Sequence, residues 1–204
     1  MNNIVLGVLG FLIIHLSDYI SLKRIALLKP IVWLMGSGLL VYAIFEVCLA
    51  IEKFSLPLWL IDLGWGLFIL FLIALLYSLF INLPFYKTYI AGGYGDKLVK
   101  TGLYALVRHP GVPSFICLML SLLLVSRSRQ LLIAAPTYVL LDIILVTVQD
   151  KFFFPKMFAG YNIYQQETPM LIPNRRSVNT FIQSLQHTKT QNGFQGGKHN
   201  DYVK

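Results

Sequence analysis

The sequence predicts an all-α integral membrane protein with about five transmembrane helices. Of its 204 residues, 56% are hydrophobic and only 13% are charged, and the mean hydropathy is +0.67. That leaves too little polar surface to coat a soluble globule. The apolar residues also form runs long enough to cross a bilayer, which takes about 20 helical residues. The net charge of +8 is spread between these runs, so we expect no nucleic-acid partner.

Residues 1–83 are predicted to form a three-span membrane region. Apolar runs cover residues 4–20, 31–51 and 56–83. The first run has no basic residue ahead of it and no small-residue cleavage pattern behind it, so we expect a retained span rather than a signal peptide. The second and third runs are long enough to cross a hydrocarbon core as helices.

Residues 84–173 combine a polar, glycine-rich stretch with a helical hairpin. Apolar character returns over residues 112–125 and again over 131–148, and a short basic turn separates the two arms. The first arm is short for a full crossing, so we expect it to start below the membrane surface. Pro113 is well suited to the first turn of that helix.

The basic residues predict the orientation in the membrane. By the positive-inside rule, the segments after the first, third and fifth runs are cytoplasmic, which places the N-terminus outside and the C-terminus in the cytoplasm. Arg127 and Arg129, in the hairpin turn, then lie on the outer side. Residues 174–204 are rich in Gln, Asn, Lys and Gly, and we expect a disordered polar tail there. The cytoplasmic basic residues are Lys23, Arg24, Lys29, Lys87, Lys97, Lys100, Arg108, Lys151, Lys156, Arg175 and Arg176.

The candidate functional residues form a strip just before the hairpin, over residues 98–110. His109 precedes a proline, which disfavours the helical region and holds its backbone extended. An alternative is that Arg108 and His109 are interfacial residues that contact headgroups and helix ends. Before the hairpin, the candidate residues are Leu98-Val99, Gly102, Tyr104 and Arg108-His109-Pro110. After the hairpin, in sequence order, come Gln149-Asp150, Tyr161, Tyr164 and the short proline-containing segment Pro169-Met170-Leu171-Ile172-Pro173.

In order and spacing, these residues resemble the membrane methyltransferase family that includes isoprenylcysteine carboxyl methyltransferase and phospholipid N-methyltransferases. The resemblance covers residues 97–173 and implies S-adenosylmethionine as the cofactor, bound on the cytoplasmic side between the strip and Asp150. Transfer from a sulfonium needs alignment and exclusion of water, so we expect no metal site. The implied cofactor contacts are Leu98, Val99, Gly102, Tyr104, His109, Pro110 and Asp150.

The resemblance also implies the acceptor side of the reaction. Arg108 is the expected catalytic residue, since its guanidinium can pair bidentately with an anionic group. The expected acceptor is a lipid-like or small apolar molecule carrying a carboxylate, amine or thiol, which would enter sideways from the membrane. The chain departs from the family pattern at Val112 and Ser114, where a tyrosine and a glycine are usual, and at Gln149, where an acid is usual.

Other functions stay open at this stage. The departures are also typical of a catalytically lapsed relative that serves as an interaction module. A small transporter or channel subunit would instead use acids within the spans, namely Glu46, Asp62 and Asp142. Tyr104 has the alternative of an interfacial aromatic residue, Asp150 that of a partner for Lys151 or Lys156, and Tyr161 and Tyr164 are expected to pack rather than to contact a ligand.

Overall fold

The computed structural model describes residues 2–23, 25, 27–83 and 98–196, with side chains as far as residue 185. Throughout this part of the chain the regular elements are helices, and β-type pairing is limited to one isolated bridge between Lys53 and Ser128. The predicted all-α class is therefore confirmed for these residues. The polar stretch at residues 84–97 lies outside the described residues.

Four helices are long and apolar enough to cross a membrane: Asn2–Leu22, Leu28–Leu49, Leu58–Ile81 and Leu131–Met157. The fifth predicted span is the shorter apolar helix Gly111–Ser126, in which Pro113 lies in the first turn. The elements are α1 (Asn2–Leu22), α2 (Leu28–Leu49), α3 (Leu58–Leu76) with the π-helical turn η1 (Tyr77–Ile81), α5 (Gly111–Ser126), and α6 (Leu131–Val148) continued by the π-helical turn η3 (Gln149–Phe153) and α7 (Phe154–Met157).

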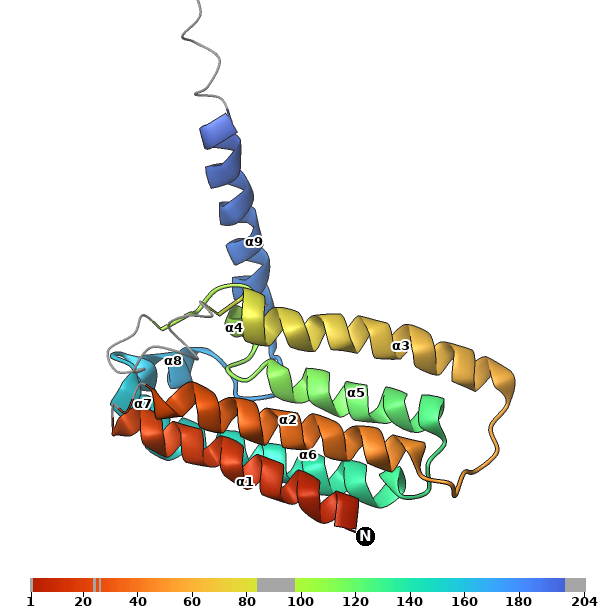
Figure 1. Cartoon of the computed structure of the whole chain (residues 1–204). Coiled ribbons are helices and arrows are strands. Elements are labelled where there is room, and N and C mark those ends of the chain that lie inside the picture. The colour runs from red at the N-terminus through yellow and green to blue at the C-terminus, as the bar shows by residue number, and fades with distance from the viewer. Residues whose placement is uncertain (1, 24, 26, 84–97, 197–204) are drawn as a thin grey trace, which may run out of the picture.

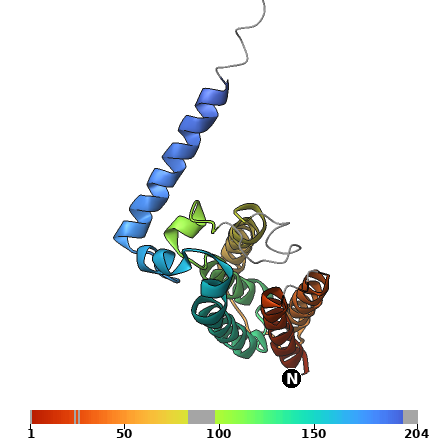
Figure 2. The ribbon, with the colours of Figure 1, turned by 90° about the vertical axis from the view of Figure 1, so that its left-hand side faces the viewer.

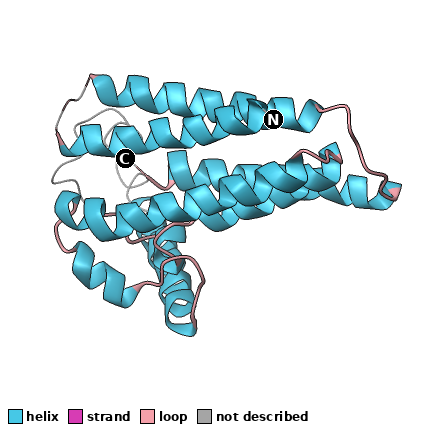
Figure 3. Cartoon of the chain, turned by 90° about the horizontal axis from the view of Figure 1, so that it is seen from below, coloured by secondary structure: helices cyan, strands magenta, loops and turns pink. Residues whose placement is uncertain are grey.

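These five apolar helices lie side by side in one bundle, with the short helices at one end (Figure 1; Figure 3). The short helices are α4 (Leu103–Leu106), α7 and α8 (Tyr161–Glu167). The chain leaves α1, α3 and α6 at this same end of the bundle (Figure 1). The ends of α1, α3 and α6 are thus neighbours in space, at what we call the strip end of the bundle.

Close approach of small residues holds α1 against α2. A Cβ atom added at Gly10 would lie 2.9 Å from the carbonyl oxygen of Gly36, and one added at Gly36 would lie 2.8 Å from the backbone nitrogen of Ile14. Such contacts bring two helix backbones together where lipid supplies no hydrophobic driving force between helices. Outward-facing side chains remain apolar, as on α3, where Trp59 and Ile73 are 64% and 61% exposed.

The hairpin turn is fastened to the connection between α2 and α3. Arg127 ends α5 in the left-handed region at φ 53°, and its carbonyl oxygen accepts a hydrogen bond from the backbone nitrogen of Phe54 (2.9 Å). The Ser128 hydroxyl donates to the carbonyl oxygen of Val47 (2.7 Å). The predicted tight turn therefore closes the end of the bundle opposite the strip.

The prediction of a disordered tail from residue 174 is wrong for residues 175–196. They form helix α9 (Arg175–Gly196). The physical reason is a reciprocal cap at the start of the helix. The Asn174 side-chain oxygen accepts a hydrogen bond from the Ser177 backbone nitrogen (2.8 Å), and the Asn174 backbone nitrogen donates one to the Ser177 hydroxyl (3.1 Å). Such a cap satisfies donors that otherwise have no partner at a helix start.

Candidate functional site

The strip begins at a turn that only glycine accommodates well. Gly102 has φ +61°, and a Cβ atom there would lie 2.4 Å from the side-chain oxygen of Asn82. That oxygen accepts a hydrogen bond from the Leu103 nitrogen (2.9 Å), and the Asn82 amide donates to the Thr101 carbonyl (3.1 Å). Asn82, just after η1, therefore fixes the start of α4 against the end of α3.

Arg108 joins the strip to the chain beyond the hairpin. Its Nε and Nη2 atoms donate to Oδ1 and Oδ2 of Asp150, both at 2.9 Å. Its Nη1 atom donates to the carbonyl oxygens of Gln165 (2.9 Å) and Thr168 (2.5 Å). The side chains of the pair are 9% and 7% exposed. This is a buried bidentate pair, the geometry that favours arginine over lysine.

The backbone of the strip pairs with the segment after α8. The Arg108 nitrogen donates to the Pro169 carbonyl (2.9 Å) and the His109 nitrogen to the Met170 carbonyl (3.2 Å). The backbone of His109 is thus tied to the segment after α8, and its extended conformation before Pro110 stays a prediction. Its ring stacks on Phe154 with a centroid distance of 5.7 Å and an interplanar angle of 16°.

Asp150 is the centre of the site. Besides Arg108, it accepts a hydrogen bond from the Tyr161 hydroxyl on Oδ1 (2.6 Å) and from the Gln165 amide on Oδ2 (3.0 Å), and His109 Nε2 lies 3.3 Å from Oδ1. A carboxylate offers about four lone-pair sites. These partners therefore fill the acceptor capacity of Asp150. We call Arg108, His109, Asp150, Tyr161 and Gln165 the Asp150 cluster.

The two tyrosines of α8 stay neutral hydrogen-bond donors. Burial raises the pKa of Tyr161 well above its ordinary value, and the hydrogen bond to the Asp150 carboxylate raises it further. Burial likewise raises the pKa of Tyr164. The Tyr164 hydroxyl donates to the Tyr104 carbonyl (2.5 Å). Both phenols therefore act as hydrogen-bond donors, Tyr161 to Asp150 and Tyr164 to the strip, rather than as proton acceptors.

The structure brings together some of the predicted site residues and separates others from the centre. Arg108, His109 and Asp150 meet directly, and Pro110 is buried beside them. Tyr104 is half-buried, and its hydroxyl donates to the Ser78 carbonyl (3.2 Å). Leu98, Val99 and Gly102 lie earlier on the strip and are half-buried.

This geometry bears on two predicted placements. The 3.3 Å contact between His109 and Asp150 places these two residues directly against each other. The position of the cofactor between the strip and Asp150 stays a prediction. Arg108 donates to Asp150 and two carbonyls rather than standing free for an acceptor. The physical reason is that a buried guanidinium needs partners from its own chain.

Sequence reasoning missed two members of the cluster. Tyr161 was expected to pack, and its ring does contact the Phe154 ring. Its hydroxyl also donates a hydrogen bond to Asp150. Gln165 was not considered. The signal was their separation by four residues, which places two polar side chains on one face of a helix. Gln149, where the family usually has an acid, instead donates to Asp18 of α1 (2.8 Å).

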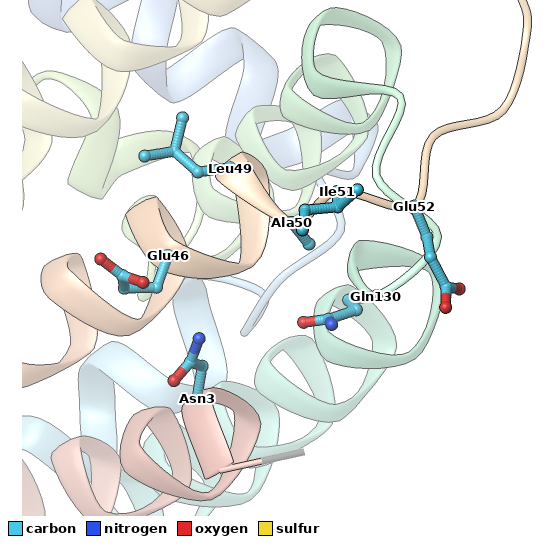
Figure 4. Close-up of a pocket in the computed structure, with 7 residues that line it drawn as sticks. All are labelled: Asn3, Glu46, Leu49, Ala50, Ile51, Glu52 and Gln130. Carbon is cyan, nitrogen blue, oxygen red and sulfur yellow. The ribbon is translucent and has the colours of Figure 1, made fainter.

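The acids proposed for a transport function do not gather. Glu46 lines a cavity of about 420 Å³ at the end of the bundle opposite the strip, together with Asn3, Glu52 and Gln130 (Figure 4). Asp62 is exposed on α3 and Asp142 is half-buried on α6. Within the described ranges, no group of three or more His, Cys, Asp or Glu side chains is placed to hold a metal ion.

Comparison of the chain with protein-family models, with curated proteins and with solved structures found no match.

Proposed function

We propose that this chain is an integral membrane methyltransferase that uses S-adenosylmethionine. The acceptor is a lipid-like or small apolar molecule with a carboxylate, amine or thiol, met at the cytoplasmic membrane face. One observation supports the proposal most: Arg108 and Asp150, 42 residues apart in sequence, pair at 2.9 Å with His109 beside them. These are the residues for which the resemblance implies a single site.

The strip end of the bundle also supports the orientation. Helices α1, α3 and α6 all end there, and the segments that follow them in the sequence contain most of the basic residues. The positive-inside rule makes this end cytoplasmic, with five spans, the N-terminus outside and the C-terminus inside. A polar donor then reaches the site from water while an apolar acceptor reaches it from the bilayer.

Arg108 and Asp150 are positioning residues in this proposal. They hold the strip against α8 and keep His109 in one orientation, with Nε2 directed at Asp150. The donor contacts are then assigned to the strip residues for which the resemblance implies them: Leu98, Val99, Gly102, Tyr104, His109 and Pro110. S-adenosylmethionine, when bound, supplies a methyl group already activated as a sulfonium.

A second candidate is a catalytically lapsed relative that acts as a membrane interaction module. The filled acceptor capacity of Asp150 favours it, because the carboxylate has no site left for a cofactor's ammonium or ribose. Val112, where the family usually has a tyrosine, is 3% exposed and belongs to the core. This reading predicts that the folded protein does not bind the cofactor.

Binding of S-adenosylmethionine to the full chain in detergent separates the two. We expect saturable binding that His109→Phe weakens about tenfold, or about 1.4 kcal/mol, because phenylalanine keeps the stack on Phe154 but removes both ring nitrogens. Glu46→Gln, at the opposite end, is the matched control and should bind like the unaltered chain. Failure of a folded, monodisperse protein to bind rejects the methyltransferase and supports the lapsed relative.

A further inference from the structure

Helix α9 leaves the bundle and runs across the direction of the spans. Figure 1 shows it rising from the strip end beside α4, and Figure 2, which looks along the bundle, shows that it lies beyond the edge of the five apolar helices. A helix that crosses the span direction at the end of a membrane bundle is oriented along the membrane surface rather than through it.

One face of α9 packs against the bundle. Helix α9 contacts α4, and Ser177 is buried while Phe181 and Ser184 are half-buried. These three residues are spaced four and three apart, so they share one face. That face, together with the Asn174 cap, fixes the helix at its first turns.

The neighbouring face is apolar and uncovered. Val178, Ile182 and Leu185 are 38%, 47% and 48% exposed. They are spaced four and three apart and form a stripe parallel to the one that packs on α4. The polar residues Asn179, Thr180 and Gln183 are exposed on the rest of the circumference. An exposed apolar stripe on an otherwise polar helix is the pattern of a helix that lies in a membrane interface.

The charge near this stripe fits an anionic lipid surface. Arg175 and Arg176 are exposed in the first turn, and Lys100 and Lys151 are exposed at the same end of the bundle. Anionic headgroups attract basic residues near the surface by about 1 kcal/mol each. Ile172, just ahead of α9, adds a further exposed apolar side chain, at 80% exposure.

We propose that α9 is an interfacial helix that docks on the anionic lipid surface of the cytoplasmic leaflet, with Val178, Ile182 and Leu185 inserted and Arg175 and Arg176 on the headgroups. This inference needs the bundle to span a membrane with its strip end cytoplasmic, and it stands or falls separately from the methyltransferase.

Spin labels on the two faces of α9 test the proposal in the full chain reconstituted into vesicles. The background is Cys48→Ala with Cys117→Ala, which removes both native thiols, each half-buried. The labelled variants are Ile182→Cys on the apolar stripe and Thr180→Cys, an exposed position on the opposite side of the helix, as the matched control. Both sites are exposed to an appreciable extent, so the bundle should keep its thermal stability.

The readout is the ratio of collision rates with oxygen, which concentrates in lipid, and with a water-soluble nickel chelate. We expect this ratio at position 182 to be several times that at position 180, and to rise further when phosphatidylserine is added to phosphatidylcholine vesicles. Equal ratios at the two positions overturn the proposal, and a ratio at 182 that ignores phosphatidylserine overturns the choice of an anionic surface. Spin–spin broadening that disappears on dilution with unlabelled protein assigns the stripe to a second copy and also overturns it.

Discussion

Asp150→Asn tests whether the Asp150 cluster holds the strip in place. The substitution keeps the shape of the side chain but removes the negative charge opposite Arg108. The guanidinium, 9% exposed, would then retain two backbone carbonyls as its strong partners. Removing one partner of a buried ion pair costs about 3–5 kcal/mol, because the other charge stays buried without compensation. For a chain of this size we expect a fall in Tm of about 10 °C.

A double-mutant cycle in detergent measures the coupling. The variants are Asp150→Asn, Arg108→Met and the two combined, with unfolding followed by tryptophan fluorescence. Because both single changes leave one charge unpaired, the combined variant should be more stable than the sum of the single effects predicts, by about 0.5–3 kcal/mol. Lys100→Gln is the control on the same strip. Its pair with Glu167 (3.3 Å) is 40% and 46% exposed, so the loss should stay within about 1 kcal/mol.

Additive single effects would refute the reasoning, since they would mean that Arg108 and Asp150 do not depend on each other. A fall in Tm for Lys100→Gln as large as that for Asp150→Asn would refute the reasoning as well. It would show that any change on the strip destabilises the chain, whether or not the altered group is buried.

Two further predictions concern the helix contacts and the α8 phenols. Gly10→Ala should destabilise the bundle by about 1–3 kcal/mol, because its Cβ would meet the Gly36 carbonyl at 2.9 Å. Gly38→Ala should not, because a Cβ there has nothing within 4 Å. Equal Tm values for the two variants would contradict the close packing of α1 on α2. Stability should also decline as pH rises above about 10, the ordinary phenol pKa, because the raised pKa values of Tyr161 and Tyr164 make the folded state hold these protons more tightly than the unfolded state. Tyr161→Phe should lessen that alkaline slope in thermal unfolding scans, and an unchanged slope contradicts the assignment.

The apolar runs were sufficient to predict the helices that pack in the bundle. Their length and composition decide the outcome, because a backbone in lipid must satisfy its own hydrogen bonds. The prediction failed in the tail, where composition suggested disorder. There the order depends on a local pattern, Asn174 followed by Ser177, and on apolar residues at helical spacing from Val178 to Leu185. Mean polarity hides both signals, since the helix needs only one apolar stripe.

The sequence was sufficient to predict which residues of the strip and η3 meet at the candidate site, but not which hydrogen bonds they form. Proximity of Arg108, His109 and Asp150 follows once a hairpin joins their segments, because both hairpin ends return to one side of the bundle. Which atoms remain free depends instead on α8, whose register directs Tyr161 and Gln165 at the same carboxylate. The four-residue spacing of Tyr161 and Gln165 places them on one face of α8, but it does not specify the carboxylate that they contact.

These hydrogen bonds change what Asp150 can do in either candidate function. A carboxylate that already accepts from an arginine, a phenol and an amide holds neighbouring segments together, and binding a cofactor with it would require breaking one of those bonds. The thermodynamic cycle and the cofactor titration therefore answer different questions. If Asp150→Asn destabilises the chain while the unaltered chain binds no S-adenosylmethionine, the cluster is purely structural. If His109→Phe weakens binding while the fold keeps its Tm, the strip is the binding surface and the rest of the cluster is its support.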